Sequence, residues 1–103
     1  MLIVTTETSP GRTFEALGLV EGSVIQSAHF GKDLAAFFKT LVGGEIKGYG
    51  EMMERARAQA TERMAEQARR LGADAVVGMR YATSSVMQGA AEMLAFGTAV
   101  KFN

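Results

Sequence analysis

The sequence predicts an α+β domain in which an antiparallel sheet packs on one long helix. Three observations indicate this class: a helical pattern ends at Gly72, an alternating strand follows it directly, and β-prone residues gather near both ends of the chain. The expected order is β-β-α-α-β-β, with consecutive strands side by side at each end. A length of 103 residues, 48% of them hydrophobic, fits a single domain over residues 1–103.

The first part of the chain is expected to be extended. Residues 2–5 predict a short strand, and residues 6–12, which contain the only proline, predict a turn or loop. Residues 13–27 are rich in β-prone side chains but space them too irregularly for one clean strand. Gly18 and Gly22 indicate a bulge or a bend, so one bent strand and a hairpin both fit.

Two helices are expected next. Residues 31–42 predict a short helix, because apolar side chains recur in the i, i+3, i+4, i+7 pattern at Leu34, Phe37, Phe38 and Leu41. Residues 43–50 hold four of the twelve glycines and predict a loop that joins this helix to the long one.

The long helix is recognised by an apolar stripe that repeats every three or four residues: Met53, Ala56, Ala60, Met64, Ala68 and Leu71. Arg69 and Arg70 suit the negative end of the helix dipole, and Gly72 can adopt the left-handed conformation that ends a helix. Half of the stripe is alanine, so close packing is expected. The pattern leaves open whether the stripe packs only on its own sheet or also on neighbouring subunits.

The C-terminal part predicts a hairpin. Residues 75–82 alternate as a mostly buried strand, residues 84–89 predict a loop, and residues 91–102 alternate again as the last strand.

Charge and composition exclude several functions. Eleven basic residues balance eleven acidic ones, which leaves no net field to hold nucleic acid or an anionic membrane. The chain has no cysteine, so disulfides, thiolate metal sites and thiol nucleophiles are excluded. The N-terminus has no signal-peptide pattern, and we expect a cytoplasmic protein.

The glycines before the long helix raise the possibility of an anion site. Gly43-Gly44 and Gly48-Tyr49-Gly50 could cradle a phosphate with backbone amides. A P-loop, however, needs Lys and Ser or Thr at the helix start, where this chain has Glu51. An interhelical turn is therefore favoured over a small-anion site.

Three further constellations have a functional and a structural interpretation. His29 and Asp33 stand four residues apart like paired metal ligands, but two ligands do not make a site. Glu62 and Glu66 could do acid–base work, although nearby arginines favour a solvated, salt-bridged face. The chain has seven methionines, a count that suggests a soft-metal site, but their spacing favours core packing. No catalytic or metal-binding residue is assigned, and no cofactor is expected.

Three segments together resemble the YbjQ-like family of small proteins: residues 43–60, GGEIKGYGEMMERARAQA, residues 71–81, LGADAVVGMRY, and residues 96–101, FGTAVK. The family is uncharacterised and carries the label "putative heavy-metal-binding". The resemblance implies a subunit like that of dodecin, assembled as a ring-like homo-oligomer, most often a pentamer. It also favours a role for the alanine stripe in that assembly.

These observations lead to three hypotheses. The leading one is a cytoplasmic homopentamer with a binding or scaffolding role, whose expected partner is itself. The alternative is a metal-binding protein with sites shared between subunits. The third is an enzyme that acts on a small anion at the glycine-rich loop, and we expect the protein not to be an enzyme.

Overall fold

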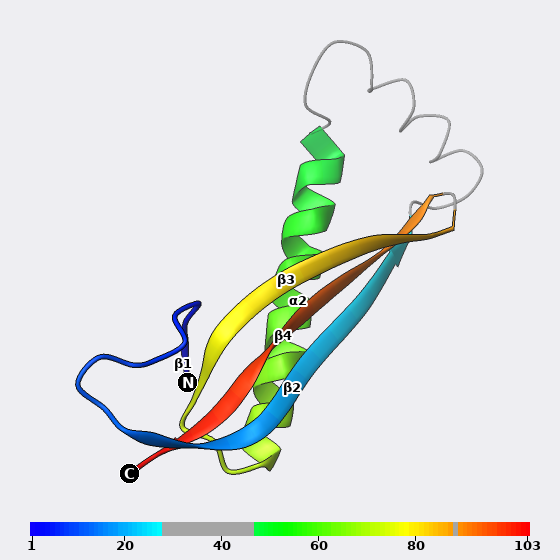
Figure 1. Ribbon diagram of the computed structural model, residues 1–103. Helices are drawn as coiled ribbons and strands as arrows, with labels where there is room; N and C mark the ends of the chain where they lie inside the picture. The colour runs from blue at the N-terminus through cyan, green and yellow to red at the C-terminus, as the bar shows by residue number, and fades with distance from the viewer. Residues whose placement is uncertain (28–46, 88) are drawn as a thin grey trace.

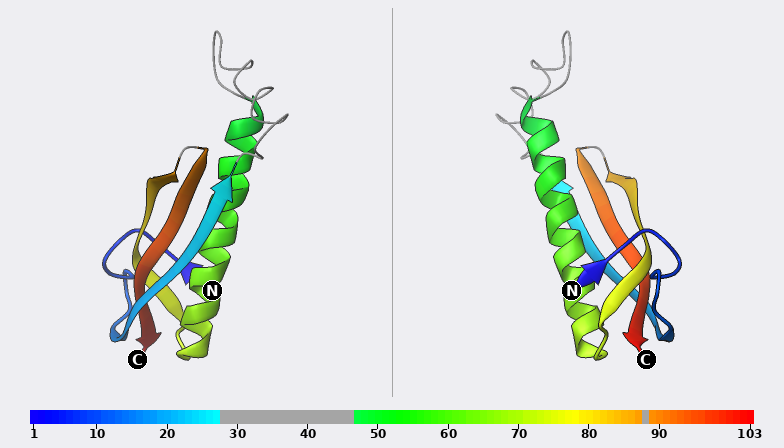
Figure 2. Two further views of the ribbon diagram at one scale, coloured as in Figure 1. Left: turned by 90° about the vertical axis from the view of Figure 1, so that its right-hand side faces the viewer. Right: turned by 90° about the vertical axis from the view of Figure 1, so that its left-hand side faces the viewer.

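A computed structural model of the chain describes residues 1–27, 47–87 and 89–103 (Figure 1). The elements are β1 (Leu2–Ile3), β2 (Phe14–Ser27), α2 (Lys47–Arg70), β3 (Ala75–Met87) and β4 (Ala90–Phe102). They confirm the α+β class, with α2 packed across one face of a four-stranded sheet (Figure 2). The predicted short helix over residues 31–42 lies outside the described residues.

The sheet is mixed, so the prediction of an antiparallel sheet is wrong in one place. The strand order is β1-β3-β4-β2, and β1 pairs in parallel with β3 and not with its neighbour in sequence, β2. The reason is that β2 pairs with β4 along its whole length, which leaves the outer edge of β3 for β1. Beyond β1 the ladder continues, since the Met79 amide donates to the Val4 carbonyl at 3.1 Å.

Residues 14–27 form one strand, which excludes the hairpin alternative. The predicted irregularity is a β-bulge: the register with β4 shifts between Ala16 and Gly18, and Gly18 has a φ of 140°. A bulge places one extra residue on its strand and reverses which side chains face the core. After Leu17, Val20 and Val24 therefore point toward α2 and are buried.

The predicted C-terminal hairpin is confirmed, but its loop is shorter than expected. Residues 84–87 belong to β3, where Ser84 pairs with Glu92 and Ser85 with Ala91. The prediction of a loop over residues 84–89 is therefore wrong for most of its length. The serines are exposed, so their polarity costs little in a strand whose backbone is satisfied by β4.

Helix α2 buries its alanine stripe against its own sheet. Ala56, Ala60, Met64 and Ala68 are fully buried in a core that also contains Val20, Val24, Val76, Met79, Met93, Ala95 and Ala99. These four side chains have no exposed surface left, and the alternative that the stripe also packs on neighbouring subunits stays a prediction for its other members. Two ends of the stripe differ: Met53 is half-buried, and Leu71 is exposed just after the helix.

A second, smaller core lies on the other face of the sheet. Ala75, Val77 and Val100 are buried there beneath Val4, Phe14 and Phe102. The loop after β1 lies on this side of the sheet, away from α2 (Figure 2). One end of this face is thus covered by the chain's own N-terminal segment. Among the described helical residues, no segment is long and apolar enough to cross a membrane.

Candidate functional site

The sheet surface opposite α2, here called the far face, carries exposed apolar side chains. Along β2 after the bulge, every second residue points to the far face, beginning with Leu19 and ending with Ile25. Leu19 is 69% exposed and Ile25 is 64% exposed. A single exposed aliphatic side chain is common on protein surfaces, whereas a patch of several such side chains is typical of an interaction surface.

Strand β4 extends this surface. Leu94 and Phe96 are half-buried on the far face, where Ser23 pairs with Leu94 and Glu21 with Phe96. We call Leu19, Ile25, Leu94 and Phe96 the far-face patch. The covered end of the far face, around Val100, lies next to it. The patch is suited to docking, since an apolar sheet surface offers area for burial but no reactive group.

The far-face patch was not predicted from the sequence. The signal was present as two interleaved alternations, Leu19-Glu21-Ser23-Ile25 and Val20-Gly22-Val24. The extra residue at Leu17 shifts the alternation by one position, so residues 13–27 read as irregular.

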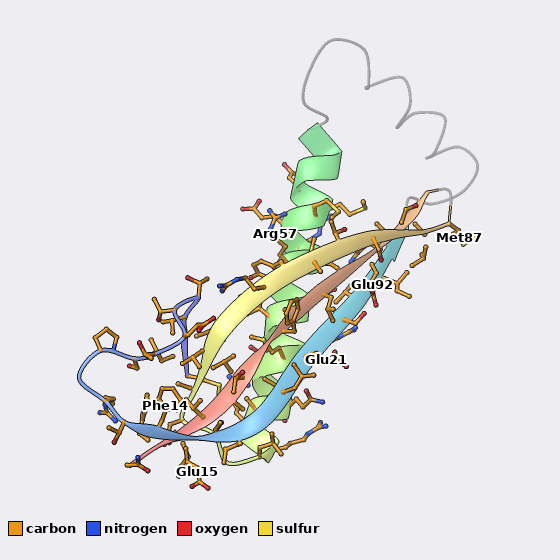
Figure 3. The ribbon with its side chains drawn as sticks, viewed as in Figure 1. Phe14, Glu15, Glu21, Arg57, Met87 and Glu92 are labelled. Carbon is orange, nitrogen blue, oxygen red and sulfur yellow. The ribbon has the colours of Figure 1, made fainter. Side chains whose placement is uncertain are left out.

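A carboxylate borders the far-face patch. The Ser23 hydroxyl donates a 2.7 Å hydrogen bond to Oε2 of Glu92, and Glu92 is half-buried. Figure 3 shows Glu92 on β4 and Glu21 on β2. The far face therefore combines apolar area with two acidic side chains.

The glycine-rich segment differs from its prediction. Residues 47–50 belong to α2, so Gly48-Tyr49-Gly50 lies in the first turn of the helix and not in a loop before it. Each residue added to an existing helix contributes one further hydrogen bond, which helps to offset the roughly 1 kcal/mol cost of each glycine. Glu51 is exposed directly after these residues and places negative charge where an anion would bind. Gly43-Gly44 lies outside the described residues.

Glu62 and Glu66 belong to a salt-bridged outer face of α2. Nη1 of Arg69 lies 2.9 Å from Oε1 of Glu62 and 3.4 Å from Oε2 of Glu66, and Arg70 also pairs with Glu66. The hydrogen bond that Arg69 donates to Glu62, together with the negative charge of Glu62, raises the pKa of Arg69 above its ordinary value. All of these side chains are exposed, so the solvated interpretation is confirmed.

The buried methionines act as core packing. Met64, Met79 and Met93 lie in the main core, with Met53 packed against it. A cation placed among them would lose its hydration shell and gain only neutral thioether ligands, which is costly in an apolar interior. This agrees with the interpretation of the methionines as core packing.

No group of three or more His, Cys, Asp or Glu side chains occurs within residues 1–27, 47–87 and 89–103. The whole sequence lacks cysteine, and the predicted pair His29 and Asp33 lies outside the described residues.

Comparisons with known proteins agree with the resemblance seen in the sequence. The model of the YbjQ family, described as "Putative heavy-metal-binding", matches residues 1–103. A UPF0145 protein of Thermotoga maritima is 61% identical over 102 residues, which cover 98% of this chain and 96% of that protein. A UPF0145 protein of Vibrio campbellii is 59% identical over 102 residues and covers 98% of both chains.

A solved structure also resembles the fold. It is described as a protein of unknown function of the DUF74 family from Pediococcus pentosaceus, and it matches with a TM-score of 0.73 over 100% of this chain and 98% of that chain. The identity is 16%, so this likeness concerns the fold alone.

Proposed function

The chain belongs to the YbjQ family, and from this premise we propose that it is a self-associating cytoplasmic protein with a binding or scaffolding role. The assembly is a ring-like homo-oligomer, with five subunits as the expected number. Catalysis is not part of this proposal, because the far-face patch offers docking area and no reactive group.

The observation that carries the proposal is the exposure of Leu19 and Ile25 on the far face. They extend the apolar surface formed by Leu94 and Phe96, and contiguous apolar surface favours association through burial. The adjacent part of the same face is already covered by the N-terminal segment. A second copy is the proposed cover for the rest.

Light scattering coupled to gel filtration tests the proposal. We expect wild type to elute at five times 11.0 kDa, about 55 kDa, and the double variant Leu19→Ser/Ile25→Ser to shift toward the 11.0 kDa monomer. Leu71→Ser is the matched control, because Leu71 is 48% exposed but lies at the end of α2. A monomeric wild type at all concentrations would exclude self-association.

A second candidate function is metal binding at sites shared between subunits. It is supported by the description of the family model and by Glu92, a half-buried carboxylate beside the far-face patch. If far faces of different copies meet, their carboxylates approach one another. Such a site would take oxygen ligands, which suit hard or borderline cations.

Elemental analysis of protein purified without a metal-affinity tag tests this second candidate. A shared site predicts a fixed amount of metal per assembly in wild type and its loss in Glu92→Gln. Glu15→Gln serves as the control, because Glu15 is an exposed glutamate of β2 that pairs in register with Lys101. Metal-free wild type after incubation with zinc, copper and nickel would remove the candidate.

A further inference from the structure

Within the described part of the chain, strand β2 is an outer strand of the sheet, and its outer edge pairs with no other strand. All of its 14 residues except Leu17 pair with β4, and β2 is last in the order β1-β3-β4-β2. An outer strand exposes unpaired amides and carbonyls that can pair with a strand of another chain. Residues 19–25, LVEGSVI, are also rich in β-branched and aliphatic side chains, which further favours pairing with a strand of another chain.

Helix α2 comes unusually close to the middle of this edge. A Cβ placed on Gly22 would collide with the carbonyl oxygen of Ala60 and the amide nitrogen of Met64. Only glycine allows this approach of helix backbone to strand. The side chains of α2 next to Gly22 therefore reach the strand backbone.

Two of these side chains bind the backbone of β2 on either side of Gly22. Oε1 of Gln67 accepts a 2.7 Å hydrogen bond from the amide of Glu21, and Nη1 of Arg63 donates a 2.6 Å hydrogen bond to the carbonyl of Ser23. Since α2 supplies both partners, the two backbone groups point away from β4. They are the groups that an added strand would use.

We propose that Arg63 and Gln67 guard the edge of β2 against the addition of a strand from a second copy of the chain. The amide of Glu21 and the carbonyl of Ser23 lie two residues apart, which is the spacing at which one strand offers successive bonds to a neighbour. When both groups are occupied, an added strand loses its central pairing positions. Contacts between copies are then limited to side-chain surfaces or to other edges.

This inference is independent of self-association through the far-face patch. The proposed guard acts on backbone groups at the outer edge of β2, whereas the far-face patch consists of side chains on the sheet face opposite α2. A wild-type monomer would contradict the proposed function and leave the guard intact. Conversely, normal formation of the ring would not contradict the proposed guard.

The test compares Arg63→Ala/Gln67→Ala with Arg55→Ala/Gln59→Ala. The control pair has the same residue types at the same spacing on α2, and both of its side chains are exposed. Strand aggregation is followed by thioflavin fluorescence and light scattering at increasing protein concentration. We expect the guard variant to form strand-rich aggregates at concentrations where wild type and the control pair remain in their usual size distribution.

Amide hydrogen exchange at Glu21 provides a local readout that does not depend on aggregation. Gln67→Ala should accelerate exchange of this amide by about fivefold, the effect of losing one hydrogen bond. Gln67→Glu retains an acceptor and should keep the wild-type rate. If the double variant does not fold, the exchange rates of wild type and the two single variants at Gln67 still test the proposal. Equal exchange in all three proteins, or a guard variant that stays unaggregated, would overturn the proposal.

Discussion

Gly22 shows how a single residue can be required for a reason that sequence alone does not reveal. The sequence indicated a bulge or bend at Gly18 and Gly22, and the bulge lies directly before Gly18, with Leu17 as the extra residue. Gly22 lies instead where α2 approaches, and it is not among the glycines with a positive φ. A glycine kept for close approach has no local sequence signal, because the neighbour it meets lies about forty residues away.

Substitution of Gly22 by alanine should therefore be costly. The added methyl group meets backbone atoms of Ala60 and Met64, which cannot move without shifting α2. We expect a loss of about 2–3 kcal/mol in the free energy of unfolding, as for overpacked cores, measured by urea denaturation. Glu21→Ala, at the exposed neighbouring side chain, should change the free energy by less than about 0.5 kcal/mol. Equal stabilities of the two variants would contradict the close approach.

At the scale of elements, the end of α2 was predicted well because its signals are local. The amide of Ala73 donates to the carbonyl of Ala68 at 3.0 Å, and the amide of Gly72 donates to Arg69 at 2.9 Å. This pair of bonds is a Schellman motif, with Gly72 at φ 81°. Glycine at this position and cations in the last turn can be read directly from the sequence.

The left-handed conformation of Gly72 gives a prediction for the helix end. Gly72→Ala should cost about 1–2 kcal/mol in the free energy of unfolding, because a Cβ is disfavoured at positive φ. Among the described residues other than Gly72 and its two chain neighbours, no atom lies within 4 Å of the added Cβ, so the cost is conformational and not steric. Gly72→Asn should cost less, since asparagine tolerates this region. An alanine variant as stable as the asparagine variant in thermal unfolding would contradict this explanation.

The strands were predicted less well because their partners lie far away in sequence. The serines of residues 84–85 suggested a loop, yet pairing with β4 extends β3 through them. The bulge at Leu17 hid the alternation that exposes Leu19 and Ile25. Periodicity identified the buried stripe of α2, whereas the far-face patch depends on which residues the bulge turns outward.

For the whole molecule, the largest error concerned the place of β1. Only Leu2 and Ile3 form this strand. Parallel strands are joined by a long connection and not by a tight turn, so no turn signal in the sequence marks the pairing of β1 with β3. The N-terminal segment is fixed instead by distant groups, among them Nη1 of Arg80, which donates to the carbonyl of Thr5 at 2.8 Å. The class α+β followed from the elements, but the mixed order of the sheet depends on these tertiary contacts.

The N-terminal segment should therefore contribute to stability through the second core and not only through β1. Val4 packs on Val77 and Val100, and its amide donates to the carbonyl of Val76 at 2.9 Å. Val4→Ser removes apolar area from this core and should lower the free energy of unfolding by about 1–2 kcal/mol in urea. It should also increase binding of a hydrophobic dye, as Val77 and Val100 become accessible.

Leu2→Ser is the matched control, since Leu2 is an exposed apolar residue of the same segment. Its effect should remain within about 0.5 kcal/mol, as for most surface substitutions. Circular dichroism should show the same helix content in both variants, because α2 packs on the opposite face of the sheet. If Val4→Ser is as stable as wild type, the second core does not depend on the N-terminal segment.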